Sequence, residues 1–119
     1  MDSITSLILS HNPLGGSIPN SLGKLGQLQV LEMENDGLSG AIPAELGNAN
    51  ELTTILLARN KLSGAIPGNL LNLTGLTQFD VSNNNLSGMI PPHTAIIPAS
   101  AFKNNSGLCG APLPPCKHA

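Results

Sequence analysis

The stretch NKLSGAIPGNL, from Asn60 to Leu70, decides how the chain is to be interpreted. It is largely apolar, yet it contains Gly64 and Pro67, and glycine and proline interrupt both helices and strands. The same residue types return when the chain is shifted by 24 residues, so that Asn60 falls on Asn84. The stretch is therefore part of a 24-residue internal repeat, and this repeat is the period of the chain.

Four copies of this period align without an insertion or a deletion. The repeat is L-x-x-L-x-L-x-x-N-x-L-x-G-x-I-P-x-x-L-G-x-L-x-x. Its columns are Asn12, Asp36, Asn60 and Asn84; Leu14, Leu38, Leu62 and Leu86; Gly16, Gly40, Gly64 and Gly88; Ile18, Ile42, Ile66 and Ile90; and Pro19, Pro43, Pro67 and Pro91. Upstream stand the apolar sets Ile4, Leu7, Leu9; Leu28, Leu31, Met33; Leu52, Ile55, Leu57; and Leu76, Phe79, Val81.

The repeat resembles the leucine-rich repeat, and in particular the plant extracellular variety, which is marked by the L-x-G-x-I-P half. The resemblance covers nearly the whole chain. It implies an α/β-class leucine-rich repeat solenoid, with a short parallel β-sheet on the concave side and extended and 3-10 segments on the convex side. We expect four 24-residue repeats over residues 1–91 and an irregular C-terminal cap over residues 92–119.

Each repeat position has a physical reason. Alternation in LTTILLARN points Leu52, Ile55 and Leu57 inward, as in a short strand. Glycine allows backbone angles that a Cβ would resist, and proline holds an extended segment on the other side of the coil. The asparagine amide both donates and accepts, so a column of asparagines bonds the buried loops of adjacent coils. An ionised carboxylate accepts but cannot donate, so the hydrogen bonds of this column should be weaker in the second coil, unless Asp36 is protonated or partly hydrated.

The composition favours a stack of repeats over a globular domain with a single large core, and it excludes several functions. The chain has no Trp or Tyr and two Phe, so thin aliphatic layers must supply the burial. One coil cannot offset its own ordering entropy, so neighbours and caps must cover its faces. Five scattered Lys and Arg and a net charge of −2 exclude a nucleic-acid partner. No apolar run approaches the roughly 18 residues of a bilayer span, so this segment does not insert into a membrane.

The two ends of the chain differ. Met1-Asp2-Ser3 shows no secretion signal, and the N-terminal cysteine-paired cap of the family is missing, so we expect an excised piece or a truncated product. The stretch FKNNSGLCGAPLPPC resembles the C-terminal cap of plant receptor-like kinases and receptor-like proteins. That resemblance implies a disulfide between Cys109 and Cys116, and we expect Phe102, Leu108 and Leu113 to cover the last coil. A metal site at Cys109, Cys116 and His118 is the disfavoured alternative.

The outward strand positions are free to carry recognition, because the core does not need them. One column is Ile8, Glu32, Leu56 and Asp80; the next is Ser10, Glu34, Ala58 and Ser82; the third is His11, Asn35, Arg59 and Asn83. We predict a mildly acidic ligand-binding face that accepts a peptide or protein with basic groups. The alternative, a solvated face without a ligand, stays open. The predicted binding residues are Glu32, Glu34, Asn35, Leu56, Arg59, Asp80 and Asn83.

Catalysis is not expected. The three histidines, His11, His93 and His118, have no nucleophile at a matching place in the repeat. The glycine-rich loop, catalytic-loop aspartate and D-F-G motif of the kinases are absent from the sequence. We therefore predict a chain that is no enzyme and that needs no cofactor or metal.

Three glycosylation sequons begin at Asn72, Asn85 and Asn104. With the cysteine-bearing cap they favour an extracellular or cell-surface parent protein. The first hypothesis is a membrane-proximal fragment of a receptor-like kinase ectodomain that binds a peptide, a protein or a co-receptor. The family implies a second-choice co-receptor site around Arg59, Asp80, Asn83 and the cap. The alternatives are a secreted inhibitor of a cell-wall hydrolase, similar to the polygalacturonase inhibitors, and a nonfunctional truncation.

Overall fold

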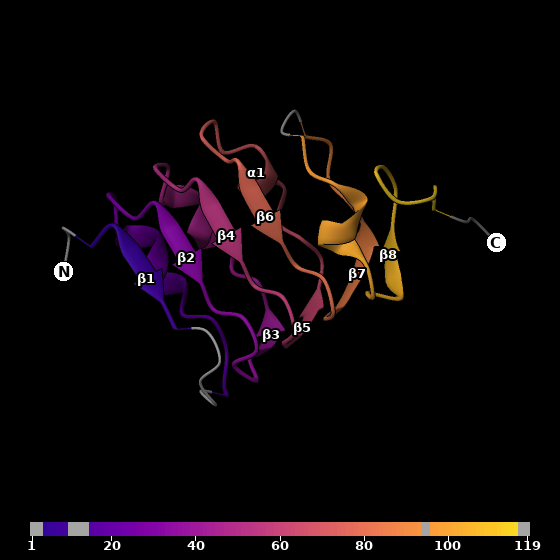
Figure 1. Cartoon of the computed structure of the whole chain (residues 1–119), viewed down its shortest axis with the longest axis horizontal. Helices are drawn as coiled ribbons and strands as arrows, with labels where there is room; N and C mark the ends of the chain where they lie inside the picture. Colours follow the sequence, from indigo (N-terminus) through magenta and orange to yellow (C-terminus); the bar gives the residue numbers. More distant parts are fainter. Residues whose placement is uncertain (1–3, 10–14, 94–95, 117–119) are drawn as a thin grey trace.

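The computed structural model describes residues 4–9, 15–93 and 96–116, and the chain winds into coils that stack along the long axis of the molecule (Figure 1). Each coil gives one short strand to a parallel sheet, here named the concave sheet. Its strands, in spatial order, are β1 (Ser6–Ile8), β2 (Val30–Glu32), β4 (Thr54–Leu56) and β6 (Gln78–Asp80). Leu7 pairs with Leu31 and Leu31 with Ile55, so the 24-residue period of the sequence is also the register of this sheet.

A second parallel sheet, here named the outer sheet, is built from the L-x-G half of the repeats. Its strands are β3 (Ser39–Ala41), β5 (Lys61–Gly64), β7 (Asn85–Met89) and β8 (Gly107–Cys109). The sequence predicts extended segments here, and the structure adds that these segments hydrogen-bond to one another. Gly40 and Gly64 have φ angles of 79° and 77°, which glycine adopts without strain.

Short helical turns follow the prolines of the repeat. They are η1 (Asn20–Lys24), η2 (Ala44–Asn48) and α1 (Gly68–Leu71). Pro67 before α1 has a φ of −64°, the angle that its ring fixes and that suits the residue next to a helix. The sequence predicts 3-10 turns, and the third coil forms a short α-helix instead. Its Leu71 stands where the second coil has Gly47, and leucine favours a helix more than glycine does.

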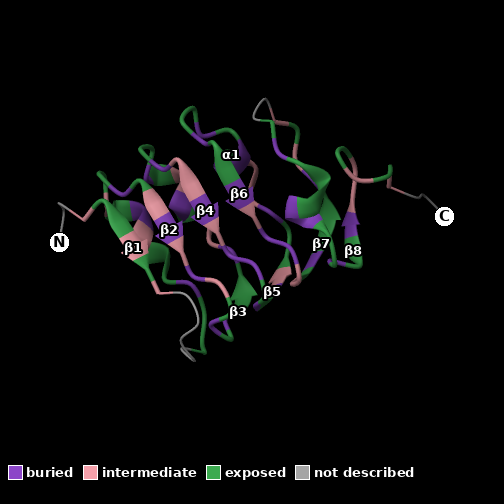
Figure 2. Ribbon diagram, viewed as in Figure 1, coloured by how far each residue is buried: buried purple, intermediate pink, exposed green. Residues whose placement is uncertain are grey.

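One hydrophobic core runs through the stack (Figure 2). The isoleucines of the Ile-Pro column are all buried, with exposed fractions of 3–4%. The inward strand residues Leu31 and Ile55 are fully buried, whereas Leu7 in the first coil is only partly buried. The molecule measures 47 × 31 × 19 Å, as expected of stacked coils. Asn12 and Leu14, which begin their columns, lie outside the described residues.

The asparagine ladder has the predicted bonding. Oδ1 of Asn60 accepts the backbone N–H groups of Asp36 and Leu38 at 2.9 and 3.1 Å. Its Nδ2 donates to the carbonyl oxygens of Met33 and Leu57 at 2.8 and 3.0 Å. Asn60 therefore bonds groups of its own coil and of the preceding coil, and Asn84 repeats the arrangement one coil later.

The cap is more regular than the sequence suggests. Asn105 forms a further rung, because its Oδ1 accepts the N–H of Leu86 and its Nδ2 donates to Val81 and Phe102. The helical turn η3 (Ala99–Phe102) and β8 complete a shortened coil. Phe102 is fully buried in the core, as predicted.

Two further expectations for the cap are met. Leu108 is buried, and Leu113 packs against the core while partly exposed. Cys109 and Cys116 form the disulfide that the resemblance implies. The cap thus closes the C-terminal end of the core with apolar side chains and one covalent link.

Candidate functional site

The concave sheet places three of the predicted binding residues in one row. Glu32 of β2, Leu56 of β4 and Asp80 of β6 are register partners on neighbouring strands. Neighbouring strands lie about 4.8 Å apart, so Leu56 sits between two carboxylates. All three side chains are half-buried. The row offers an apolar contact flanked by negative charge, and nothing in the core requires it.

Asp80 is the most firmly positioned of these residues. Its Oδ1 accepts the backbone N–H of Ser82 at 2.9 Å. This bond holds the carboxylate at the end of β6, where its second oxygen remains able to accept a bond from a ligand.

The second predicted column is less open than strand alternation suggests. Glu34 is half-buried, but Ala58 and Ser82 are buried, with exposed fractions of 3% and 5%. The prediction that these two side chains face outward is wrong. The chain has already turned inward here, because the carbonyl oxygen of Ala58 accepts a bond from the Asn60 amide.

The third column has an unusual backbone. Asn35, Arg59 and Asn83 have φ angles of 57°, 61° and 60°, which lie in the left-handed region. Asparagine is enriched at such angles, so the turn itself explains Asn35 and Asn83. Arginine gains nothing from this conformation, and the Arg59 side chain is exposed. Arg59 is therefore the residue of this column whose identity the fold does not explain.

A pocket of about 280 Å³ lies at the cap-side edge of the concave sheet. We name it the edge pocket. It combines Leu56 and Asp80 from the predicted binding face with cap residues that the sequence did not single out. Its lining consists of Leu56, Thr77, Gln78, Phe79, Asp80, Ile96, Ile97 and Pro98.

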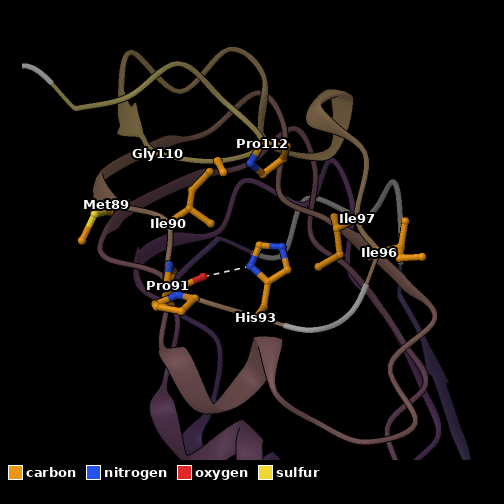
Figure 3. Close-up of a pocket in the computed structure, with 10 residues that line it drawn as sticks. Met89, Ile90, Pro91, His93, Ile96, Ile97, Gly110 and Pro112 are labelled. Carbon is orange, nitrogen blue, oxygen red and sulfur yellow. Dashed lines mark hydrogen bonds between the residues drawn. The ribbon is translucent and has the colours of Figure 1, made fainter.

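A second pocket, of about 520 Å³, lies between the end of β7 and the cap (Figure 3). We name it the cap groove. Its walls are mainly apolar, and Figure 3 shows the His93 ring between Pro91 and Ile97. Nδ1 of His93 lies 2.8 Å from the Pro91 carbonyl oxygen, so Nδ1 carries the proton and donates it. Sequence reasoning missed this groove, although Ile96 is 96% exposed, because the repeat pattern ends at Pro91.

The three sequon asparagines are all exposed. Nδ2 of Asn72 donates to the carbonyls of Gly68 and Pro92, and Nδ2 of Asn104 donates to Oδ1 of Asn83 at 2.7 Å. A glycan attaches through Nδ2, so it would compete with these bonds. Asn85 has no side-chain hydrogen bond among the described residues. Glycosylation remains a prediction, and Asn85 has the most accessible geometry for it.

The structure suggests neither a metal centre nor a membrane span. Within residues 4–9, 15–93 and 96–116, no three His, Cys, Asp or Glu side chains gather as metal ligands would. None of the helices in those ranges combines the length and the apolar character that crossing a membrane requires. His11 and His118 lie outside the described residues.

Comparison with known proteins agrees with this architecture. The family described as Leucine Rich Repeat matches residues 3–25, 51–73 and 75–95. The chain belongs to the leucine-rich repeat family. The second leucine-rich repeat, which contains Asp36 in place of the ladder asparagine, is the one that the match omits. A search of curated protein sequences gave no match.

Solved leucine-rich repeat structures place the chain among plant receptor-kinase ectodomains. It is 39% identical to the BIR2 ectodomain from Arabidopsis thaliana, with a TM-score of 0.87, covering 94% of this chain and 60% of that one. A chain of the BIR3–SERK2 complex from Arabidopsis thaliana is 39% identical, with a TM-score of 0.92, covering 98% and 62%. The Arabidopsis receptor kinase HAESA, solved with the peptide hormone IDA and the co-receptor SERK1, is 40% identical, with a TM-score of 0.72, covering 74% and 15%.

The leucine-rich repeat chain thus spans about 60% of the length of the first two of these structures. At this identity and coverage the similarity extends to both sheets and to the cap. The chain therefore has the architecture of plant leucine-rich repeat ectodomains.

Proposed function

We propose that the chain is the membrane-proximal recognition segment of a plant receptor-kinase ectodomain. It binds a peptide or protein partner on the concave sheet and performs no catalysis. In this proposal residues 1–91 carry the ligand surface and residues 92–119 form the end cap. The parent protein is extracellular or at the cell surface, and its signal arises in a domain outside this chain.

One observation carries the proposal. Glu32, Leu56 and Asp80 form a row of partly exposed side chains that the core does not use, and the exposed Arg59 occupies a backbone conformation that suits asparagine better. Residues that the fold does not require are available for recognition. The similarity to HAESA, solved with a peptide hormone and a co-receptor, supports a ligand of this kind.

The cap supports the membrane-proximal position. Phe102 and Leu108 cover the C-terminal end of the core, and the disulfide between Cys109 and Cys116 links the cap covalently, as expected at the end of a stack. Sequencing the parent transcript beyond Ala119 tests this part, and a hydrophobic span of about 20 residues is expected. A stop codon at that place would support a secreted protein instead.

Ligand binding is tested with the ectodomains of BIR3 and SERK2, each immobilised separately. We expect the chain to bind one of them. A triple variant, Glu32→Gln, Glu34→Gln and Arg59→Asn, should weaken binding at least tenfold. Glutamine keeps the shape of glutamate, the Arg59 side chain is exposed, and asparagine suits the left-handed turn, so the circular dichroism spectrum should not change. Absence of binding to both ectodomains, or equal binding by the triple variant, would contradict the proposed partner surface.

A further inference from the structure

The concave sheet has an open edge at β6. Within the described residues β6 pairs with β4 on one side and with no strand on the other. Successive residues of a strand direct their N–H and C=O groups alternately to the two sides. Gln78 faces β4, since its N–H donates to Thr53 at 3.0 Å. The Asp80 carbonyl also faces β4, where it accepts the Leu57 N–H at 2.8 Å. The N–H and C=O of Phe79 therefore face the open edge.

The carbonyl of Thr77 belongs to the same edge. Its counterparts in the earlier coils, the carbonyls of Thr5, Gln29 and Thr53, each accept two backbone N–H groups from the next coil at 2.7–3.1 Å. No described residue donates to the Thr77 carbonyl, and none bonds to the backbone groups of Phe79. The edge therefore presents two acceptors and one donor at the spacing of a strand.

The short cap coil explains why this edge is open. The cap resumes the pairing at Val81, whose N–H donates to the Ala101 carbonyl at 2.8 Å. Before that point the chain forms the turn η3 instead of a strand. The edge pocket, of about 280 Å³, occupies this place and is lined by Thr77 and Phe79 themselves. Unpaired backbone groups beside an open space are a template for one more strand.

We infer that β6 accepts an extended peptide segment of a partner protein as an additional parallel strand, with a basic side chain beside Asp80. One peptide residue donates to the Thr77 carbonyl and accepts from the Phe79 N–H. The residue two positions later donates to the Phe79 carbonyl. This inference rests on the proposed recognition function and specifies the ligand chemistry at one end of the recognition face.

The basic side chain follows from the register. The second of these peptide residues continues the row of Glu32, Leu56 and Asp80, so its side chain lies next to Asp80 on the concave face. Opposite charges on neighbouring strands stabilise the pair, whereas a second carboxylate would be repelled. The aliphatic part of a lysine or arginine would also pack on the half-buried Leu56. The peptide residue between the two faces Ile97, which favours an apolar side chain.

The test uses the synthetic peptide acetyl-Ser-Thr-Val-Lys-Thr-Ser-amide and the isotope-labelled chain. In nuclear magnetic resonance titrations we expect saturable shifts at Thr77–Asp80 and slower hydrogen exchange of the Phe79 amide. N-methylation of the lysine nitrogen removes the bond to the Phe79 carbonyl and should weaken binding about tenfold. Replacing lysine by glutamate should weaken it at least as much.

Two matched variants of the chain distinguish peptide binding at the β6 edge from a general attraction of the peptide to the acidic face. Asp80→Asn keeps the oxygen that accepts the Ser82 N–H and should weaken peptide binding about threefold. Glu32→Gln removes the same charge two strands away and should weaken peptide binding less than Asp80→Asn does. Equal weakening by both variants, unchanged binding of the N-methylated peptide, or no saturable shift at millimolar peptide would overturn the inference.

Two further outcomes complete the test. Shifts at Thr77–Asp80 that depend on protein concentration without peptide would show that a second copy uses the edge, and they would also overturn the inference. If both ectodomains fail to bind while the peptide binds as described, BIR3 and SERK2 are excluded as partners and the addition of a strand to β6 is supported. If an ectodomain binds and the peptide does not, the recognition function is supported and the addition of a strand to β6 is contradicted.

Discussion

The regular coils and the cap solve the same problem with different lengths of chain. Between coils, the ladder asparagine bonds a backbone N–H 22 residues before it and a carbonyl 27 residues before it, as Asn60 and Asn84 do. In the cap, Asn105 makes the corresponding bonds 19 and 24 residues before it. The cap coil is therefore three residues shorter, yet it keeps the rung.

The difference shows which part of the repeat is indispensable. The cap keeps the ladder amide, a large buried side chain and an outer-sheet strand, here Asn105, Phe102 and β8. Among the described residues it contributes no strand to the concave sheet. Backbone groups buried by stacking must be bonded, whereas the edge of a sheet is able to face solvent. The cap thus ends the stack without leaving buried backbone N–H and C=O groups unbonded. The three experiments below test this comparison between the regular coils and the cap.

The largest expected effect concerns Phe102 in the cap. If the cap is a full member of the core, Phe102→Ala should lower the free energy of unfolding by about 3–5 kcal/mol, because the fully buried ring leaves a cavity. Leu57→Ala in a regular coil is the matched variant, and we expect about 2–5 kcal/mol. Urea denaturation measures both. A Phe102→Ala chain within about 1 kcal/mol of the wild type would mean that the cap is only a loose cover.

An intermediate effect concerns the ladder. Asn60→Ala leaves two N–H groups and three carbonyls without their bonds and should cost about 3 kcal/mol. Asn105→Ala leaves one N–H group and three carbonyls and should cost about 2 kcal/mol. Asn85→Ala, at an exposed position, is the control and should change stability by less than about 0.5 kcal/mol. Thermal unfolding of the three variants ranks them, and a cost at Asn105 no larger than at Asn85 would break the parallel.

The smallest expected effect is a gain. Asp36 is fully buried at a ladder position, and its carboxylate cannot supply the donors that Asn60 supplies one coil later. Asp36→Asn should raise the free energy of unfolding by about 1 kcal/mol, and Asn60→Asp should lower it. Denaturation midpoints at constant pH measure the pair. Loss of stability in Asp36→Asn would show that the carboxylate has a role that an amide cannot fill.

The sequence predicts most of the fold because each repeat position has a separate physical cause. The concave register, the ladder bonds and the buried isoleucine column all follow from the 24-residue period. The regularity of the cap was not predictable from that period, because the shift from 24 to 21 residues moves Phe102 and Asn105 out of alignment. The pairing of the outer-sheet strands was not predicted either, because the sequence of an extended segment does not identify the strand with which it pairs.

The candidate site was predictable only in part. Alternation along the strands correctly brings Glu32, Leu56 and Asp80 together on one face. It fails at Ala58 and Ser82, because the bonds of the ladder turn the chain inward there. The edge pocket and the cap groove depend on Ile96 and Ile97, which belong to no repeat, so no sequence pattern indicated their place.

The two sheets also differ in how far the chain slips between coils. Partners in the concave sheet are 24 residues apart, as Leu31 and Ile55 are, whereas partners between β3 and β5 and between β5 and β7 are 22 apart, as Ser39 and Lys61 are. Between β7 and β8 the separation is 20. One side of each coil thus stays level with its neighbour while the other side steps by two residues, or about 6.6 Å. The concave strands therefore cross the stacking direction nearly at right angles, whereas the outer strands are inclined to it. A partner that spanned several coils would meet equivalent concave residues side by side, but equivalent outer residues displaced along the strands by two positions per coil.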